Sequence, residues 1–332
     1  MIAVRARGGG RVGLGYTYAD VSTARFIGSL LTGVVEGADA LRVGETWVAM
    51  NAAIRNAGRP GLGMMAISAV DVALWDLKAR LLDVPLVDLL GVAHDGVPVY
   101  GSAGFTSYSL DTLREQLAGW VERGIPRVKM KISREPLRDP ERLDAARKAI
   151  GDEPELYVDA NGALSRKQAL EWAHRLRHEW RVSWFEEPVT SDDPEGLRLV
   201  RDGGPGGLDV AAGEYGFLLS DFRTLLDAGA VDCLQADVTR CGGITGLLQV
   251  AGLAAANQVD LSAHCAPQVS AHAFSAVLRV RHLEYFHDHV RVERMLLDGA
   301  LEPRGGLLHP DRSRPGLGVE LKESDAERYR VA

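Results

Sequence analysis

The chain has 332 residues, of which 46% are hydrophobic and 25% are charged, and its formal net charge is −7. This composition is ordinary for a globular protein, and an acidic chain without a basic block argues against binding to nucleic acid or to an anionic membrane surface. No apolar run approaches the roughly 18 residues of a membrane-spanning helix, and residues 1–10 lack the apolar core of a secretory signal. We therefore expect a cytoplasmic protein that binds neither nucleic acid nor membrane.

The first 95 residues differ in pattern from the rest of the chain. A glycine-rich segment over residues 12–18 predicts a short strand, and three glycines and a proline over residues 55–65 predict a loop. A strong helix is predicted over residues 66–82, where apolar residues recur at spacings of three and four: Val70, Leu74, Leu77 and Leu81. We interpret residues 1–95 as a small α+β capping domain.

From residue 97 onward, eight short apolar runs recur every 22–29 residues, which is the length of one strand–loop–helix–loop unit. Helix-start signals lie between them, at Asp139-Pro140 and in the capping-box pattern from Ser165 to Gln168. Eight strands with interleaved helices favour a closed barrel over an open sheet. No clear helix follows the last strand, and His287-Asp288-His289 is interpreted as a polar loop. We therefore predict a (β/α)7β barrel over residues 96–315, with a tail over 316–332 that returns to the cap.

Three carboxylates stand at the ends of consecutive predicted strands, one repeat unit apart: Asp159, Glu186 and Glu214. Strand ends of a barrel meet at one face, where active sites lie. Three converging carboxylates repel one another unless a cation binds them, and oxygen ligands select a hard cation. The pattern predicts a Mg²⁺ site.

The neighbouring strands also end in ionisable residues. Lys129 and Lys131 lie two residues apart, so both side chains point to the same side of a strand, and mutual repulsion with partial burial is expected to lower a lysine pKa toward that of a working base. Asp237 and His264 end successive strands and can form a dyad in which the carboxylate orients the imidazole.

The cysteines are Cys233, Cys241 and Cys265. Their odd number and the lack of a C-x-x-C spacing argue against a disulfide framework and against a cysteine zinc site. We expect three buried, inert thiols in a reducing cytoplasm.

The ordered set of strand-end motifs resembles the enolase superfamily and, within it, the mandelate racemase subgroup. The resemblance runs from about Gly13 to Lys322. Its motifs are Lys129-Met130-Lys131, Asp159-Ala160-Asn161, Phe185-Glu186-Glu187-Pro188, Gly213-Glu214, Asp237 before Gly242-Gly243, and His264. It implies a capping domain on a (β/α)7β modified TIM barrel, and a homo-oligomer that is a dimer or an octamer.

The resemblance also implies roles for residues. Asp159, Glu186 and Glu214 are the implied Mg²⁺ ligands, and Asn161 is placed at the substrate. Lys131 is one base with Lys129 as its electrostatic neighbour, the Asp237–His264 pair is the opposing acid/base, and Glu284 hydrogen-bonds the enolate. The expected substrate is a small carboxylate, and the expected activity is dehydration of an aldonate or aldarate to a 2-keto-3-deoxy acid.

Two alternatives stay open from the sequence. The same residues can racemise or epimerise a 2-hydroxy acid if no β-hydroxyl lies beside His264. Relatives usually begin with about 30–40 further residues, so either the start codon is assigned late or the cap is reduced. A reduced cap would also allow a non-catalytic metabolite-binding protein, although every catalytic position is filled.

Overall fold

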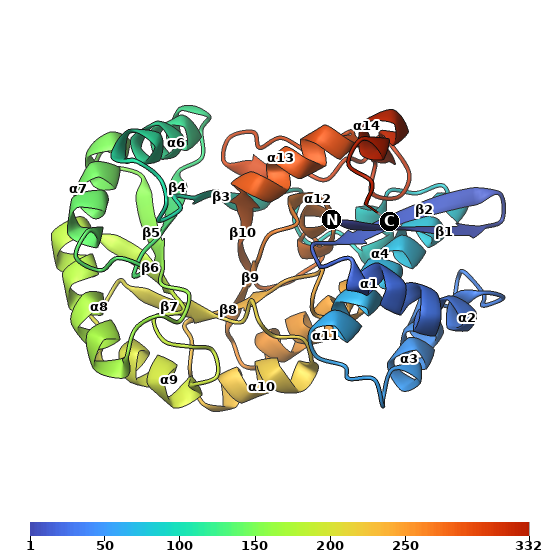
Figure 1. Ribbon diagram of the computed structural model, residues 1–332, viewed down its shortest axis with the longest axis horizontal. Coiled ribbons are helices and arrows are strands. Elements are labelled where there is room, and N and C mark those ends of the chain that lie inside the picture. The colour runs from blue at the N-terminus through green and yellow to red at the C-terminus, as the bar shows by residue number, and fades with distance from the viewer. Residues whose placement is uncertain (332) are drawn as a thin grey trace.

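The computed structural model describes residues 1–331, and its centre is a closed barrel of eight parallel strands (Figure 1). Each strand pairs with the next along the chain, and the last pairs with the first, β10 with β3, which closes the barrel. The strands are β3 (Val97–Ala103), β4 (Arg127–Lys131), β5 (Glu155–Asp159), β6 (Val182–Glu186), β7 (Asp209–Ala212), β8 (Cys233–Ala236), β9 (Asp260–Ala263) and β10 (Val280–Phe286). All eight predicted strands are confirmed.

A helix follows each barrel strand, and α6 to α10 form an outer arc around the strands (Figure 1). The helices are α6 (Leu110–Glu122), α7 (Asp139–Ile150), α8 (Arg166–Trp180), α9 (Pro194–Gly203), α10 (Leu219–Asp227), α11 (Gly243–Ala256), α12 (Pro267–Phe274) and α13 (His287–Leu296). The predicted capping box is present, because the Ser165 hydroxyl accepts from the Gln168 backbone N–H and the Gln168 side chain accepts from Ser165.

Helix α13 corrects the sequence analysis, which predicted no helix after the last strand and a polar loop at residues 287–289. The chain passes from β10 directly into this helix, and residues 287–289 form its first turn. Its buried positions are Val290, Glu293 and Leu296. Because one of these three is a glutamate, the apolar periodicity that marks a helix is hidden in the sequence.

The N-terminal part of the chain lies beside the barrel, on the side away from α7 and α8 (Figure 1). It consists of β1 (Ile2–Gly8), β2 (Arg11–Thr17), α1 (Ser22–Phe26), the π-helical turn η1 (Ile27–Leu31), α2 (Thr32–Val35), α3 (Val43–Ala53), α4 (Leu62–Leu81) and α5 (Leu86–Leu90). The sequence predicted β2 but missed β1, its antiparallel partner. Helix α4 begins at Leu62, so the last four residues of the predicted loop are helical.

The glycines of β2 explain how this strand packs against α4. A side chain at Gly13 or Gly15 would place its Cβ 2.2 Å from the carbonyl oxygen of Ala73 or Ala69, respectively. Only glycine allows so close an approach of strand and helix. The contact holds the hairpin on the helix that also faces the barrel.

The C-terminal segment returns to the N-terminal part. It contains β11 (Leu297–Asp298), which pairs with β13 (Glu320–Leu321), then β12 (Leu307–Leu308) against β3, and α14 (Glu323–Glu327). The Leu317 N–H donates to Asp76 of α4 at 2.6 Å, and Glu323 pairs with Arg5 of β1 at 2.8 Å. These contacts agree with a returning tail, whereas the domain boundaries at residues 95 and 315 stay a prediction.

Among residues 1–331, none of the helices combines the length and the apolarity needed to cross a membrane. Cys233, Cys241 and Cys265 are all buried and unpaired, as the sequence analysis expected.

Candidate active site at the barrel mouth

Eight ionisable side chains converge at the carboxyl ends of the barrel strands, and we call them the mouth cluster. They are Lys129, Lys131, Asp159, Glu186, Glu214, Asp237, His264 and Glu284. All except Lys131 are buried, and the Lys131 side chain is 17% exposed. The sequence analysis singled out all eight, and the structure brings them together.

Strand register places the three predicted metal-binding carboxylates side by side. Asp159 of β5 lies opposite Glu186 of β6, and each is the last residue of its strand. Glu214 follows β7 after Gly213, whose φ of +132° and contact with the Gln235 carbonyl exclude a side chain there. One oxygen of each carboxylate lies within 4.8 Å of the others.

The donor set fits a hard divalent cation. The Asn161 N–H donates to Asp159 Oδ1 at 2.7 Å, and Trp184 Nε1 donates to Glu186 Oε2 at 2.9 Å, so both carboxylates are oriented from outside the cluster. Glu214 Oε2 is buried and lies 3.2 Å from His264 Nε2. Three converging carboxylates, two of them oriented in this way, are a ligand set that suits Mg²⁺.

The two lysines neutralise these carboxylates in this structure. Lys129 pairs with Glu186 and, at 2.9 Å, with Glu284, while Lys131 pairs with Asp159. Burial alone lowers the pKa of each lysine, but Glu186 and Glu284 around Lys129, and Asp159 beside Lys131, outweigh it and raise both pKa values. The predicted lowering of a lysine pKa is therefore wrong for this structure, because the sequence analysis weighed lysine–lysine repulsion without these ion pairs.

Asp237 and His264 form the predicted dyad. His264 Nδ1 lies 2.7 Å from Asp237 Oδ2, and the backbone N–H and hydroxyl of Thr239 both donate to Asp237 Oδ1 at 2.7 Å. Burial opposes the ionised carboxylate, but the bonds from His264 and the Arg240 charge outweigh it and lower the pKa of Asp237. An ionised Asp237 holds the proton on Nδ1, so His264 Nε2 faces the mouth.

Glu284 is the member of the mouth cluster that lies on β10, the last barrel strand. Ser102 of β3 donates its hydroxyl to Glu284 Oε1 at 2.6 Å. Burial raises the pKa of Glu284, but Lys129 and His264 outweigh it and lower the pKa well below its ordinary value. Glu284 is thus ionised here, in contrast to the protonated form needed for it to donate a hydrogen bond to an enolate.

Asn161 differs from the mouth cluster because its side chain is exposed. It borders a cavity of about 790 Å³ next to the carboxylates, together with Glu187, Thr190, Gly213 and Tyr215. The predicted contact of Asn161 with substrate stays a prediction.

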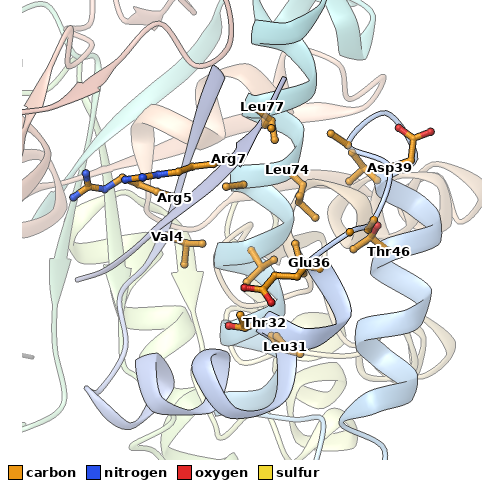
Figure 2. A pocket seen from close by; sticks show the side chains of 18 of the residues that line it. Val4, Arg5, Arg7, Leu31, Thr32, Glu36, Asp39, Thr46, Leu74 and Leu77 are labelled. Atoms are coloured by element: carbon orange, nitrogen blue, oxygen red, sulfur yellow. The ribbon is translucent and has the colours of Figure 1, made fainter. Parts of the chain in front are cut away.

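A second cavity, of about 430 Å³, lies between β1, α2 and α4 (Figure 2). Leu31, Leu74 and Leu77 line it, and the side chains of Arg5 and Arg7 extend to one side. No group of three metal-binding side chains is found there among the described residues. The groups of three side chains that could hold a metal ion lie at the mouth instead.

Comparison with known families decides the classification. Residues 1–91 match the mandelate racemase/muconate lactonizing enzyme N-terminal domain, and residues 112–325 match the enolase C-terminal domain-like family. The chain belongs to the mandelate racemase/muconate lactonizing enzyme family. The recognition made from the strand-end motifs is confirmed.

Three members of this family show how similar the chain is to known proteins. It is 34% identical over 322 residues to 3,6-anhydro-alpha-L-galactonate cycloisomerase from Streptomyces coelicolor, covering 94% of this chain and 86% of that protein. A mandelate racemase/muconate lactonizing enzyme-like protein from Rubrobacter xylanophilus superposes with a TM-score of 0.96 at 63% identity, covering 98% and 90%. L-Talarate dehydratase from Polaromonas, solved with Mg and L-glucarate, superposes with a TM-score of 0.86 at 31% identity, covering 96% and 88%.

The sequence analysis missed several residues that contact the mouth cluster. Ser102 is an uncharged residue one position before the end of β3, and Thr239 lies in a turn, so neither carried a signal. Cys265 was expected to be inert, yet its sulfur lies 3.3 Å from both His264 Nε2 and Glu284 Oε2. Its position next to His264 was the available signal.

Glu187 is a further missed residue, and its side chain is buried beside the carboxylates. Burial and the charges of Glu214 and Asp159 raise the pKa of Glu187 to about 9. The signal was the Glu186-Glu187 pair itself, from which only the first glutamate was used.

Proposed function

We propose that this protein removes the proton α to the carboxylate of a sugar acid with Mg²⁺ as cofactor, and that it dehydrates an aldonate or aldarate to a 2-keto-3-deoxy acid. The observation that carries the proposal is the position of two proton-transfer groups beside the same three carboxylates. Lys131 contacts Asp159 at one side, and His264 Nε2 lies 3.2 Å from Glu214 at the other. The dehydratase activity named for the Polaromonas relative supports it.

Asp159, Glu186 and Glu214 would hold the cation. When bound, Mg²⁺ supplies positive charge that attracts the substrate carboxylate and offsets the anions that otherwise keep Lys131 protonated. Trp184 and the Asn161 backbone keep two of these carboxylates in place, so the site is built before a ligand arrives.

Lys131, once neutral, accepts the α-proton at Nζ. The Lys129 ammonium remains nearby and favours negative charge that develops on the substrate carboxylate. Burial lowers the pKa of His264, but Cys265, Glu214 and the hydrogen bond to Asp237 outweigh it and raise the pKa well above 6.5. A protonated Nε2 can therefore donate to a β-hydroxyl, which leaves as water while the carbon–carbon double bond forms.

A second candidate is isomerisation of a sugar acid without loss of water. It is favoured by the cycloisomerase name of the Streptomyces relative and by the two proton-transfer groups, since His264 could return a proton to carbon instead of to oxygen. Both candidates share the first proton abstraction by Lys131.

A screen of product mass separates the candidates. Purified protein with Mg²⁺ is incubated with a library of sugar acids and 2-hydroxy acids, and 2-keto acids are detected by carbonyl derivatisation and mass spectrometry. A product lighter than substrate by one water supports the dehydratase. A product of unchanged mass that chromatography separates from the substrate supports the isomerase, and no product of either kind from any acid by Mg²⁺-loaded protein would contradict both.

Two further expectations belong to the proposal. A homo-oligomer, either a dimer or an octamer, is expected and can be measured by light scattering. A cytoplasmic location is proposed on the three buried, unpaired thiols, which suit a reducing compartment.

A further inference from the structure

One sulfur, one nitrogen and one oxygen meet at the side of the mouth formed by β9 and β10. They are Cys265 Sγ, His264 Nε2 and Glu284 Oε2, all on buried residues, and these atoms lie within 4.8 Å of one another. We propose that they form a second metal site, selective for a softer divalent cation such as Zn²⁺, beside the oxygen-only site of Asp159, Glu186 and Glu214.

The distances between the three atoms fit tetrahedral coordination. Metal–ligand distances of about 2.3 Å for sulfur and about 2.0–2.1 Å for nitrogen and oxygen require separations of about 3.5 Å from sulfur and about 3.3 Å between nitrogen and oxygen. The sulfur lies 3.3 Å from each partner, and His264 Nε2 lies 3.6 Å from Glu284 Oε2. Each separation is within about 0.3 Å of the tetrahedral value.

The other polar atoms of His264 and Glu284 are held by neighbouring side chains, whereas the three donor atoms contact one another and His264 Nε2 also lies 3.2 Å from Glu214 Oε2. Asp237 binds His264 Nδ1, so Nε2 is the nitrogen available to a metal, as in carboxylate–histidine–zinc arrangements. Ser102 and Lys129 both contact Glu284 Oε1, so Oε2 is the oxygen available. The site is therefore oriented without a metal present.

The two sites differ in the cation that they select. Three carboxylates favour Mg²⁺, whereas a thiolate with an imidazole favours Zn²⁺. Binding replaces the Cys265 S–H bond by a Zn–S bond and the His264 Nε2–H bond by a Zn–N bond, and it releases both protons to solvent. The cysteine spacing argued against a zinc site, but that argument covers sites built from several cysteines and not one cysteine joined by residues of other strands.

His264 belongs both to the proposed zinc site and to the proposed proton-transfer pair. We therefore expect zinc to regulate turnover. A Zn²⁺ ion on Nε2 occupies the atom that carries the proton in the dehydration step, so zinc is expected to stop turnover without displacing Mg²⁺. This consequence rests on the proposed function, whereas zinc binding itself does not.

Cobalt spectroscopy tests the binding without an activity assay. Co²⁺ is added to protein saturated with Mg²⁺, and wild type is expected to show one equivalent with sulfur-to-cobalt charge-transfer absorption and the intense visible bands of a tetrahedral ion, both removed by added Zn²⁺. Cys265→Ser replaces the thiolate by a neutral hydroxyl and should lose the charge-transfer band and at least about 100-fold in zinc affinity.

Cys233→Ser is the matched control, since it removes another buried thiol, far from the mouth at the start of β8, and should keep the wild-type spectrum. Absence of the charge-transfer band in wild type, or its persistence in Cys265→Ser, overturns the site. Zinc inhibition is then measured for each variant against its own zinc-free rate. Inhibition of wild type alone supports the regulatory consequence, and equal inhibition of Cys265→Ser overturns it.

Discussion

Buried carboxylates have different surroundings in two regions of this chain, the barrel mouth and the junction of α4 with the barrel and the tail. In the mouth, Asp159 and Glu186 face lysines and each other. At the junction, Asp71 accepts from the N–H and hydroxyl of Thr245, and Asp76 accepts from the backbone of Leu14 and Leu317. Burial of charge alone therefore does not mark an active site. Convergence of several charges from different strands does.

The comparison predicts that changes in the mouth remove activity and changes at the junction cost stability. The largest effect is expected for Lys131→Ala and His264→Asn, which delete the two proton-transfer groups. Each should lower kcat for dehydration by about 10²- to 10⁴-fold. Steady-state kinetics check this, with the exposed Lys167→Ala as control. Full activity in both variants would mean that the base assignments are wrong.

The carboxylate trio offers the second test. Glu186→Gln leaves two of three anionic ligands, so Mg²⁺ affinity should fall by about 100-fold or more. This loss exceeds that expected when a residue that only hydrogen-bonds to a metal ligand is substituted. Isothermal titration calorimetry measures the affinity, and Asp152→Asn on the surface is the control. Unchanged Mg²⁺ binding would place the metal elsewhere.

At the junction, Asp76→Ala should destabilise the protein. The substitution leaves two buried N–H groups and the Nε–H of Arg80 without their acceptor, which costs about 3 kcal/mol in the free energy of unfolding. Denaturant unfolding measures it against exposed Asp227→Ala. A fall in kcat without a loss of stability would contradict the structural role that we assign to Asp76.

The smallest expected effect concerns pH. Burial raises the pKa of Asp71 from 3.8 to about 7, against the bonds from Thr245. The folded state therefore binds more protons than the unfolded state between these values, so Asp71 makes stability fall as pH rises from about 4 to about 7. Asp71→Asn should reduce that fall by about 1 to 3 kcal/mol. Urea unfolding at pH 5 and pH 8 checks it, and an unchanged difference would show that Asp71 is not buried as a carboxylate.

The contrast between the mouth and the junction also shows which features can be predicted from the sequence. Strands repeat at a fixed spacing and end in charged residues, so the barrel and the eight mouth residues could be predicted before the structure was known. Lys131, Asp159 and Glu186 occupy paired positions on adjacent strands, which is why spacing alone located them.

What the sequence did not reveal depends on turns and on packing. Cys265 contacts His264 and Glu284 through the left-handed backbone conformation of Cys265 and Ala266, which no spacing rule predicts. The ionisation of Lys129 and Glu284 depends on side chains from several strands, so the sequence analysis misjudged the lysine pKa. Helix α13 was missed because one of its buried positions is Glu293, a charged residue that the sequence analysis reads as exposed. In the structure Glu293 accepts a hydrogen bond from the Tyr16 hydroxyl at 2.5 Å.

The central claim is that Lys131 removes the α-proton and His264 acts afterwards. The most direct test is proton exchange in D₂O with Mg²⁺ and the substrate found in the screen, followed by nuclear magnetic resonance. His264→Asn should exchange the α-proton for deuterium without forming the keto acid, and Lys131→Ala should do neither. Exchange by Lys131→Ala, or its absence in His264→Asn, would contradict the assignment of the two groups.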